Sequence, residues 1–284
     1  MNRPLAMVLL VLLWGPSCAG DSGPADAEGD APTSSDAPTS SDAPTSSDAL
    51  ASSDALASSD ALASSDVPAS PAPRIDLSWP VGEDGPYQAG HRTIDLTYEP
   101  VSTGEPRTLT VHLWYPTEAT EGEEVFYVDL FFDEGALGEA PLAPPAVGDA
   151  YPIHVHSHGD LGYAGSSPYL MRHFATHGWV VAAPDHRGNT IVDNISPRPA
   201  WMYTVRLEDI SATLDHLMSL PGDDPLTGKL DASQALLSGH SYGAYTALGL
   251  AGAGYDQAHI PSVCAEDESG ECTAEVLALF EAGL

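Results

Sequence analysis

The sequence contains few basic side chains. Nine Lys and Arg stand against 41 Asp and Glu, which gives a formal net charge of −32 at pH 7. A chain this negative repels phosphate backbones and anionic lipid headgroups, so nucleic-acid binding and electrostatic membrane docking are poor first hypotheses. The hydrophobic content of 43% is ordinary for a globular protein and excludes general disorder. We therefore expect a folded domain whose ligands are neutral, zwitterionic or cationic.

Long apolar runs are also nearly absent. The only one, residues 5–14, is half as long as the roughly 20 residues that a membrane-spanning helix needs. It predicts a secretory signal over residues 1–19, and hence export. Cys18 after Gly15-Pro16-Ser17 resembles the lipobox of bacterial lipoproteins, which implies lipidation of Cys18 and an outer-membrane, periplasmic or cell-surface location. The alternative is ordinary signal cleavage at the small-x-small triplet Ser17-Cys18-Ala19, followed by secretion.

Only three cysteines occur in the chain. Oxidising compartments let disulfides persist, so in an exported protein the two cysteines beyond Cys18 are candidates for a bridge. Cys264 and Cys272 bracket a short acidic, turn-like segment, and we predict that their disulfide closes this loop. A metal site is the alternative, but two thiols without a nearby histidine pair make a poor ligand set.

Residues 20–73 contain few large apolar side chains. From Asp30 the hexamer Asp-Ala-Pro-Thr-Ser-Ser occurs three times, followed by three copies of Asp-Ala-Leu-Ala-Ser-Ser. A six-residue period fits neither an α-helix nor a coiled-coil heptad. Proline in half of the repeats, with so little to bury, favours a disordered and solvated linker. The chemistry is therefore expected in residues 74–284, which are enough for one domain with a sizeable core.

The folded part alternates strand-like and helix-like segments. Two β-rich stretches, 93–98 and 108–115, flank a connection with Pro and Gly and are expected to pair antiparallel. Strand and helix then alternate, which predicts a mostly parallel sheet with helices on both faces, that is, an α/β fold. In the second helix Ile210, Leu214 and Leu217 are spaced as a core-facing stripe. The alternating segments are residues 153–157, 168–177, 179–183, 201–220, 235–238 and a helix from Ala244.

Loops at the carboxyl ends of parallel strands are where such folds gather their chemistry. One of them reads Gly239-His240-Ser241-Tyr242-Gly243, the G-x-S-x-G pattern of a nucleophile elbow. The serine of an elbow lies in a strained strand-to-helix turn, so the residues two positions away on each side must lack bulky side chains. Gly239 and Gly243 meet that demand. In another of these loops, we interpret residues 185–188 as a solvated loop, with lining of the cleft mouth as the alternative.

A serine that performs acyl transfer also needs backbone N–H donors for the oxyanion. Tyr242 supplies the first, and the loop after the strand 153–157 supplies the second. Gly159 permits a tight turn in that loop, so we choose the amide of Asp160, with Leu161 in reserve. Metal ligation by His156 and His158 is the alternative for this segment, but no further ligand set accompanies them.

Together these motifs resemble a branch of the α/β-hydrolases. The stretch Ser157-His158-Gly159, the segment 173–189, the elbow, and the earlier Leu113-Trp114-Tyr115-Pro116 are similar to the platelet-activating-factor acetylhydrolase and dienelactone-hydrolase-like branch. The resemblance covers about residues 90–251. It implies an α/β-hydrolase fold, Ser241 as nucleophile, and the amides of Asp160 and Tyr242 as oxyanion hole. It also implies hydrolysis of a carboxylic ester through an acyl-enzyme, with no cofactor.

The substrate class follows only from this resemblance. It implies a small-molecule or lipid ester with a short acyl group, such as a short-chain or oxidised phospholipid, and therefore a role in lipid catabolism. A polyester-cleaving or dienelactone-type hydrolase shares the same nucleophile and is the alternative enzyme function.

The acid and the base of a catalytic triad are not evident. The fold carries them on later strands, in the order Ser, Asp or Glu, His. The residues after Ser241 contain one histidine, His259, and no β-rich run, while the segment 273–284 is predicted to be helical. We therefore expect the domain 74–284 to be truncated at its C-terminus, to lack the last strands of the fold and to leave a sheet edge open. Either the chain is a fragment of a longer protein or it is a degenerate relative of the active enzymes. A catalytically inactive, tethered binding module is the rival function.

Overall fold

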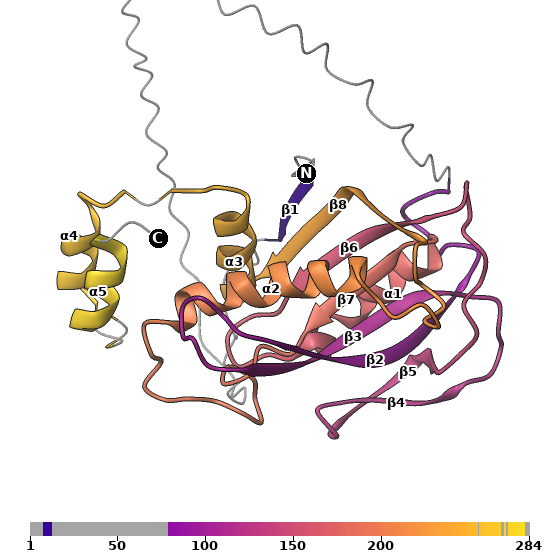
Figure 1. The fold of residues 1–284 in the computed structure, drawn as a ribbon, viewed down its shortest axis with the longest axis horizontal. Coiled ribbons are helices and arrows are strands. Elements are labelled where there is room, and N and C mark those ends of the chain that lie inside the picture. Colours follow the sequence, from indigo (N-terminus) through magenta and orange to yellow (C-terminus); the bar gives the residue numbers. More distant parts are fainter. Residues whose placement is uncertain (1–7, 13–78, 255, 268–269, 271, 282–284) are drawn as a thin grey trace, which may run out of the picture. The chain divides into compact units, whose positions relative to one another are not determined.

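The structure is a computed structural model that describes residues 8–12, 79–254, 256–267, 270 and 272–281. Their strands form one eight-stranded mixed sheet (Figure 1). Cys18 and the linker 20–73 lie outside the described residues. In order across the sheet the strands are β1 (Val8–Leu12), β8 (Leu230–His240), β6 (Tyr151–Ser157), β7 (Val180–Pro184), β3 (Arg107–Thr117), β2 (Gln88–Tyr98), β5 (Phe131–Gly138) and β4 (Glu123–Tyr127).

The centre of the sheet is parallel. β6 pairs in parallel with both neighbours, so Val155 lies opposite Leu237 of β8 on one side and Ala182 of β7 on the other. β2 and β3 form the antiparallel pair predicted from the sequence, with Ile94 opposite Val111. β3 runs antiparallel to β7 and so joins this pair to the parallel part. The prediction of a mostly parallel sheet preceded by an antiparallel pair is confirmed.

Helices cover both faces of the sheet (Figure 1). Successive side chains of a strand point to opposite faces, and the neighbours Leu113 and Trp114 accordingly belong to different cores. Trp114 packs with Met171 of α1, whereas Leu113 shares a core with Ile210 and Leu217 of α2. The stripe predicted on this helix is therefore part of the core. The helices are α1 (Pro168–Thr176), α2 (Met202–Met218), α3 (Tyr242–Leu250), α4 (Ile260–Ala265) and α5 (Ala274–Glu281), besides a 3-10 turn at Ala164–Ser166.

This arrangement is an α/β-hydrolase-like fold. A mixed, mostly parallel sheet carries helices on both faces, and β8 leads through a sharp turn at Ser241 directly into α3. In the described residues after α3 the chain forms only α4 and α5, and α5 corresponds to the helix expected over 273–284. None of the helices in the described ranges has the length and apolar character needed to cross a membrane.

The edge beside β8 differs from the expectation. The sequence leads us to expect an open edge there, but β1 pairs with β8 in parallel, with Val8 opposite Leu236 and Leu12 opposite His240. An unpaired edge presents a row of free N–H and C=O groups. Residues 8–12, from the apolar run near the N-terminus, provide partners for those groups.

Candidate active site

Ser241 lies at the junction of β8 and α3. Its φ of 52° and ψ of −116° are a conformation that costs a non-glycine residue of order 1–3 kcal/mol. The Ser241 carbonyl accepts the N–H of Ala244 at 2.8 Å, so α3 begins within the turn itself. The residue is exposed, and none of the described residues forms a hydrogen bond with its hydroxyl. The local geometry is that of a strained elbow that presents a serine to solvent.

The elbow glycines allow two close backbone approaches. A Cβ on Gly239 would lie 2.0 Å from the carbonyl oxygen of Gly243. A Cβ on Gly243 would lie 1.8 Å from the carbonyl oxygen of Ser157 in β6. No side chain fits at either distance. The elbow therefore closes on itself and packs against β6 only because both positions lack a side chain, which is the steric demand that the sequence pattern implies.

Substituting Gly243 by Ala should destabilise the fold by about 2 kcal/mol, because β6 and α3 must separate to admit the new methyl group. Gly249→Ala in the same helix is the matched control: its Cβ would meet only the end of the flexible Leu207 side chain, at 2.9 Å. Helix propensity alone would stabilise that control by up to about 1 kcal/mol. Urea denaturation of both variants measures the difference, and equal stability of the two would contradict the close approach.

The loop 158–162 lies beside Ser241. A Cβ on Gly159 would be 3.4 Å from the Cβ of Ser241 and 2.9 Å from Nδ1 of His240. The N–H of Gly162 donates to the Gly159 carbonyl at 3.1 Å, which closes a turn with Asp160 and Leu161 at its centre. The structure thus brings the turn that carries the predicted oxyanion residue, and its reserve, next to the serine.

Tyr242 occupies the first position of α3. The N–H groups of a first helical turn have no acceptor within the helix, and they lie at the positive end of the helix dipole. Its ring is buried, and the phenol oxygen has no hydrogen-bond partner in the described part of the chain. The Tyr242 amide is therefore a free donor directly after Ser241, as the sequence pattern predicts.

His156 and His158 do not share a site. Nδ1 of His156 lies 2.8 Å from Oγ of Ser238 inside the sheet. His158 lies beyond the end of β6, where its Nε2 accepts the N–H of His186 at 3.0 Å and its Nδ1 donates to the Gly159 carbonyl at 2.7 Å. Burial lowers the pKa of both, that of His156 to about 3. Among the described residues, no group of three or more His, Cys, Asp or Glu is placed to hold a metal ion.

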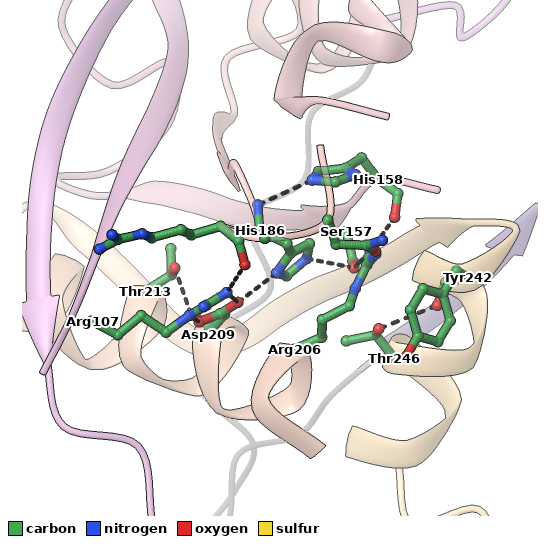
Figure 2. A network of polar contacts seen from close by, with 12 residues as sticks. Arg107, Ser157, His158, His186, Arg206, Asp209, Thr213, Tyr242 and Thr246 are labelled. Carbon is green, nitrogen blue, oxygen red and sulfur yellow. Dashed lines mark hydrogen bonds and ion pairs between the residues drawn. The ribbon is translucent and has the colours of Figure 1, made fainter. Parts of the chain in front are cut away.

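A buried chain of polar side chains links β6, the loop after β7, and α2 (Figure 2). Oγ of Ser157 lies 2.9 Å from Nε2 of His186, whose Nδ1 lies 2.8 Å from the Asp209 carboxylate. Asp209 also accepts Arg107 Nε at 2.7 Å and the Tyr98 hydroxyl at 2.6 Å. The contacts follow a Ser-His-Asp order, but Ser157 has no exposed surface, so no substrate reaches it. This network of side chains is structural: it holds β6, the loop after β7 and α2 together.

The interpretation of residues 185–188 as a solvated loop is wrong for most of its members. His186 and Gly188 are buried, Asp185 is half-buried, and only Arg187 is exposed. The next residue, Asn189, is buried too. The Asp185 carboxylate accepts the N–H of Ala164 at 2.6 Å, and Asn189 Nδ2 donates to the Asp160 carboxylate at 2.7 Å. These polar side chains are buried because the protein itself supplies their hydrogen-bond partners.

No histidine of the described part forms a hydrogen bond with Ser241. His259, which follows it in the chain, is exposed, and its Nδ1 lies 3.2 Å from Oγ of Ser262. Cys264 and Cys272 are joined by a disulfide, with their Cα atoms 5.3 Å apart, close to the same helix α4. The described residues therefore present an elbow and an adjacent turn, but they do not identify a base.

Sequence analysis did not single out the buried charges of α2. Asp209 and Arg206 are both fully buried. A signal was available, because Arg206 precedes Ile210 by four residues and so belongs to the helix face predicted to be in the core. A charged residue on an apolar stripe is the pattern that predicts a buried polar network.

No family model matches the sequence, and no curated protein sequence matches it. Among solved structures, one similar chain is a ferulic acid esterase from Streptomyces cinnamoneus, with 22% sequence identity and a TM-score of 0.46. The match covers 58% of this chain and 55% of that chain, so the region of likeness spans about half of either protein. A likeness at this level carries no information about substrate.

Proposed function

We propose that this protein is an exported serine hydrolase that cleaves carboxylic esters through an acyl-enzyme on Ser241. The observation that carries the proposal is the positive φ of 52° at an exposed serine between a buried strand and a helix. Backbone strain of this kind persists only where the surrounding structure imposes it, and it clusters at catalytic and ligand sites. Here Gly239 and Gly243 are the positions that let the strained turn form.

In the proposed reaction the Ser241 oxygen bonds to the acyl carbon of the ester. The carbonyl electron pair moves onto its oxygen, where the amides of Asp160 and Tyr242 donate hydrogen bonds. The bond to the alcohol oxygen then breaks, the alcohol leaves with a proton, and water releases the acid in the second half of the reaction. The serine proton must pass to a base, and that group is not among the described contacts of Ser241.

The substrate class that we propose is a short-acyl or phospholipid-type ester, which places the protein in lipid catabolism. A neutral or zwitterionic ester suits the net charge of −32 better than an anionic one does. A polyester or dienelactone-type ester is the alternative. We propose an outer-membrane, periplasmic or cell-surface location with a lipid on Cys18, and secretion is the alternative. Cleavage at or near Cys18 removes β1 in either case, so the β8 edge that β1 pairs in the full chain is unpaired in the exported form.

A non-catalytic binding module is the second candidate. The observation that favours it is the Ser241 hydroxyl, which has no hydrogen-bond partner among the described residues. Without a base, serine remains a protonated alcohol and a weak nucleophile. Such a module would bind an ester or a related ligand over the elbow and leave it intact.

A fluorophosphonate probe distinguishes the two functions. We expect the full chain to become covalently labelled, and we expect Ser241→Ala to abolish the labelling, because the probe reacts only with an activated serine. Ser219→Ala, which removes an exposed serine next to the end of α2, is the control and should label like the wild type. Absence of labelling in a wild-type sample that is folded by circular dichroism would support the binding module instead.

A further inference from the structure

The side chain of Arg206 contacts both segments that flank Ser241 (Figure 2). This residue of α2 is fully buried. Its Nη2 donates to the carbonyl of His158 and to Oγ of Ser157, the latter at 3.1 Å. One guanidinium thus holds the backbone at the point where β6 ends and the loop 158–162 begins.

A second contact extends this hold to Asp160. Nη1 of Arg206 donates to the side-chain carbonyl of Asn189, and Nδ2 of Asn189 donates to the Asp160 carboxylate at 2.7 Å. The same carboxylate oxygen also accepts Arg198 Nη2 at 2.8 Å. Arg206 therefore holds the chain directly at His158, just before the turn, and at Asp160 within the turn through one intervening amide side chain.

The other side of Arg206 faces the elbow. Its guanidinium carbon lies 4.5 Å from the centroid of the Tyr242 ring, within the range of a cation–π contact. The ring belongs to Tyr242, the residue directly after Ser241, so this contact helps to hold the first turn of α3 in place. Arg206 is thus positioned between the two backbone segments from which oxyanion donors are expected.

The charge of Arg206 is not neutralised by direct contact. Its acceptors are a hydroxyl, a backbone carbonyl, an amide carbonyl and an aromatic ring, and none of the described residues forms an ion pair with it. Burial lowers the pKa of Arg206 to about 10, which still leaves it charged near neutral pH. A buried cation is costly without a partner of opposite charge, so these hydrogen bonds and the ring contact are what hold the guanidinium in place.

We propose that Arg206 is a positioning residue that holds the amides of Asp160 and Tyr242 in the geometry of an oxyanion hole. This inference rests on the proposed function, since it assigns the arginine a task in the same site. Lysine cannot replace it, because one ammonium lacks the planar fork that reaches the His158 carbonyl and Asn189 together.

Two measurements on the full chain test this proposal. The first is the rate constant for fluorophosphonate labelling, which Arg206→Lys should lower about a hundredfold, the effect of misplacing reacting groups by about 1 Å. The second, which does not depend on activity, is amide hydrogen exchange by NMR, which should accelerate at Gly162 and Ala244, whose N–H groups close the turn and begin α3. Arg92→Lys, which alters a two-point arginine contact with Asp224, is the matched control and should change neither.

Chemical rescue separates positioning from simple loss of stability. In Arg206→Ala, added methylguanidinium should restore labelling and methylammonium should not, whereas equal effects of the two ions would overturn the proposal. Where Arg206→Ala does not fold, Arg206→Lys carries the test. Wild-type exchange rates at Gly162 and Ala244 in Arg206→Lys would overturn the proposal whatever the labelling does. If the wild type labels no more than Ser241→Ala, the hydrolase function fails, and amide exchange still decides the role of Arg206.

Discussion

Acidification should unfold this protein, with a loss of about 6 kcal/mol of stability between about pH 7 and pH 5.5. Burial lowers the pKa of five histidines in the folded state, to about 3 for two of them. In the unfolded chain each has a pKa near 6.5. Below pH 6.5 the unfolded state therefore binds more protons than the folded state. The contribution of these histidines to stability is fully present above pH 6.5 and is lost as the pH falls below it. The five are His91, His154, His156, His158 and His186.

The size of the effect comes from the number of groups. Each histidine that stays neutral in the folded state contributes a loss of slightly more than about 1 kcal/mol over this pH interval. A typical domain is stable by only about 5–15 kcal/mol, so five such groups are enough to approach complete unfolding. Chemical denaturation at a series of pH values measures the slope of the free energy of unfolding against pH. Near pH 5.5 this slope should correspond to the uptake of between four and five protons on unfolding.

His154 offers a matched pair of variants for this prediction. Its ring centroid lies 4.4 Å from that of Phe174, and its Nδ1 is buried without a hydrogen-bond partner. His154→Phe keeps the aromatic packing and removes one titrating group, so the slope should fall by about one proton. Phe174→Leu changes the same contact but keeps the imidazole and should leave the slope unaltered. A wild-type slope of one proton or fewer would contradict the account.

The elements that sequence analysis predicted are those with local signals. The antiparallel pair β2–β3 has alternating β-rich residues on both sides of a turn, and the elbow needs glycine two residues before and after Ser241. Each signal is read within about ten residues of chain. The parallel direction of the central strands then follows from the alternation of strands and helices, because a crossover helix joins strands that run the same way.

The hairpin β4–β5 was not predicted because its turn lacks the usual residues. Val128 and Asp129 have φ of 46° and 58°, and the N–H of Leu130 donates to the Tyr127 carbonyl at 3.0 Å. β-turns with positive φ at both central positions strongly favour Asn-Gly or Asp-Gly. A Val-Asp pair in this conformation is stabilised by the strands on either side, and no local sequence pattern predicts it.

The buried network was missed for a different reason. Asp209 contacts Arg107, which is 102 residues away in the sequence, and Arg206 contacts Asn189 and the His158 carbonyl. Charged side chains on a helix are ordinarily exposed, and only tertiary contacts supply the partners that allow their burial. Spacing shows that Arg206 lies on the core face of α2, but the identity of its partners requires the fold.

The same network gives the largest effect expected from a single substitution: Asp209→Ala should destabilise the fold by about 4 kcal/mol. The carboxylate is fully buried and accepts hydrogen bonds from Arg107, Tyr98 and His186. Its removal leaves a buried guanidinium without its counter-ion and two further donors without an acceptor, and uncompensated buried charge is costly. Thermal and urea unfolding measure the loss.

Two further variants separate this effect from a general weakening of α2. Glu208→Ala removes the adjacent carboxylate, which accepts the N–H groups of Val101 and Ser102 at an exposed position, and should cost about 1 kcal/mol or less. The double variant Asp209→Ala with Arg107→Met also removes the cation that lost its counter-ion, so part of the lost stability should return. Two results would contradict this account: a loss of stability in Asp209→Ala as small as that in Glu208→Ala, or a double variant in which Arg107→Met lowers the stability by its full single-variant amount. In either case the Arg107–Asp209 ion pair does not stabilise the loop after β7.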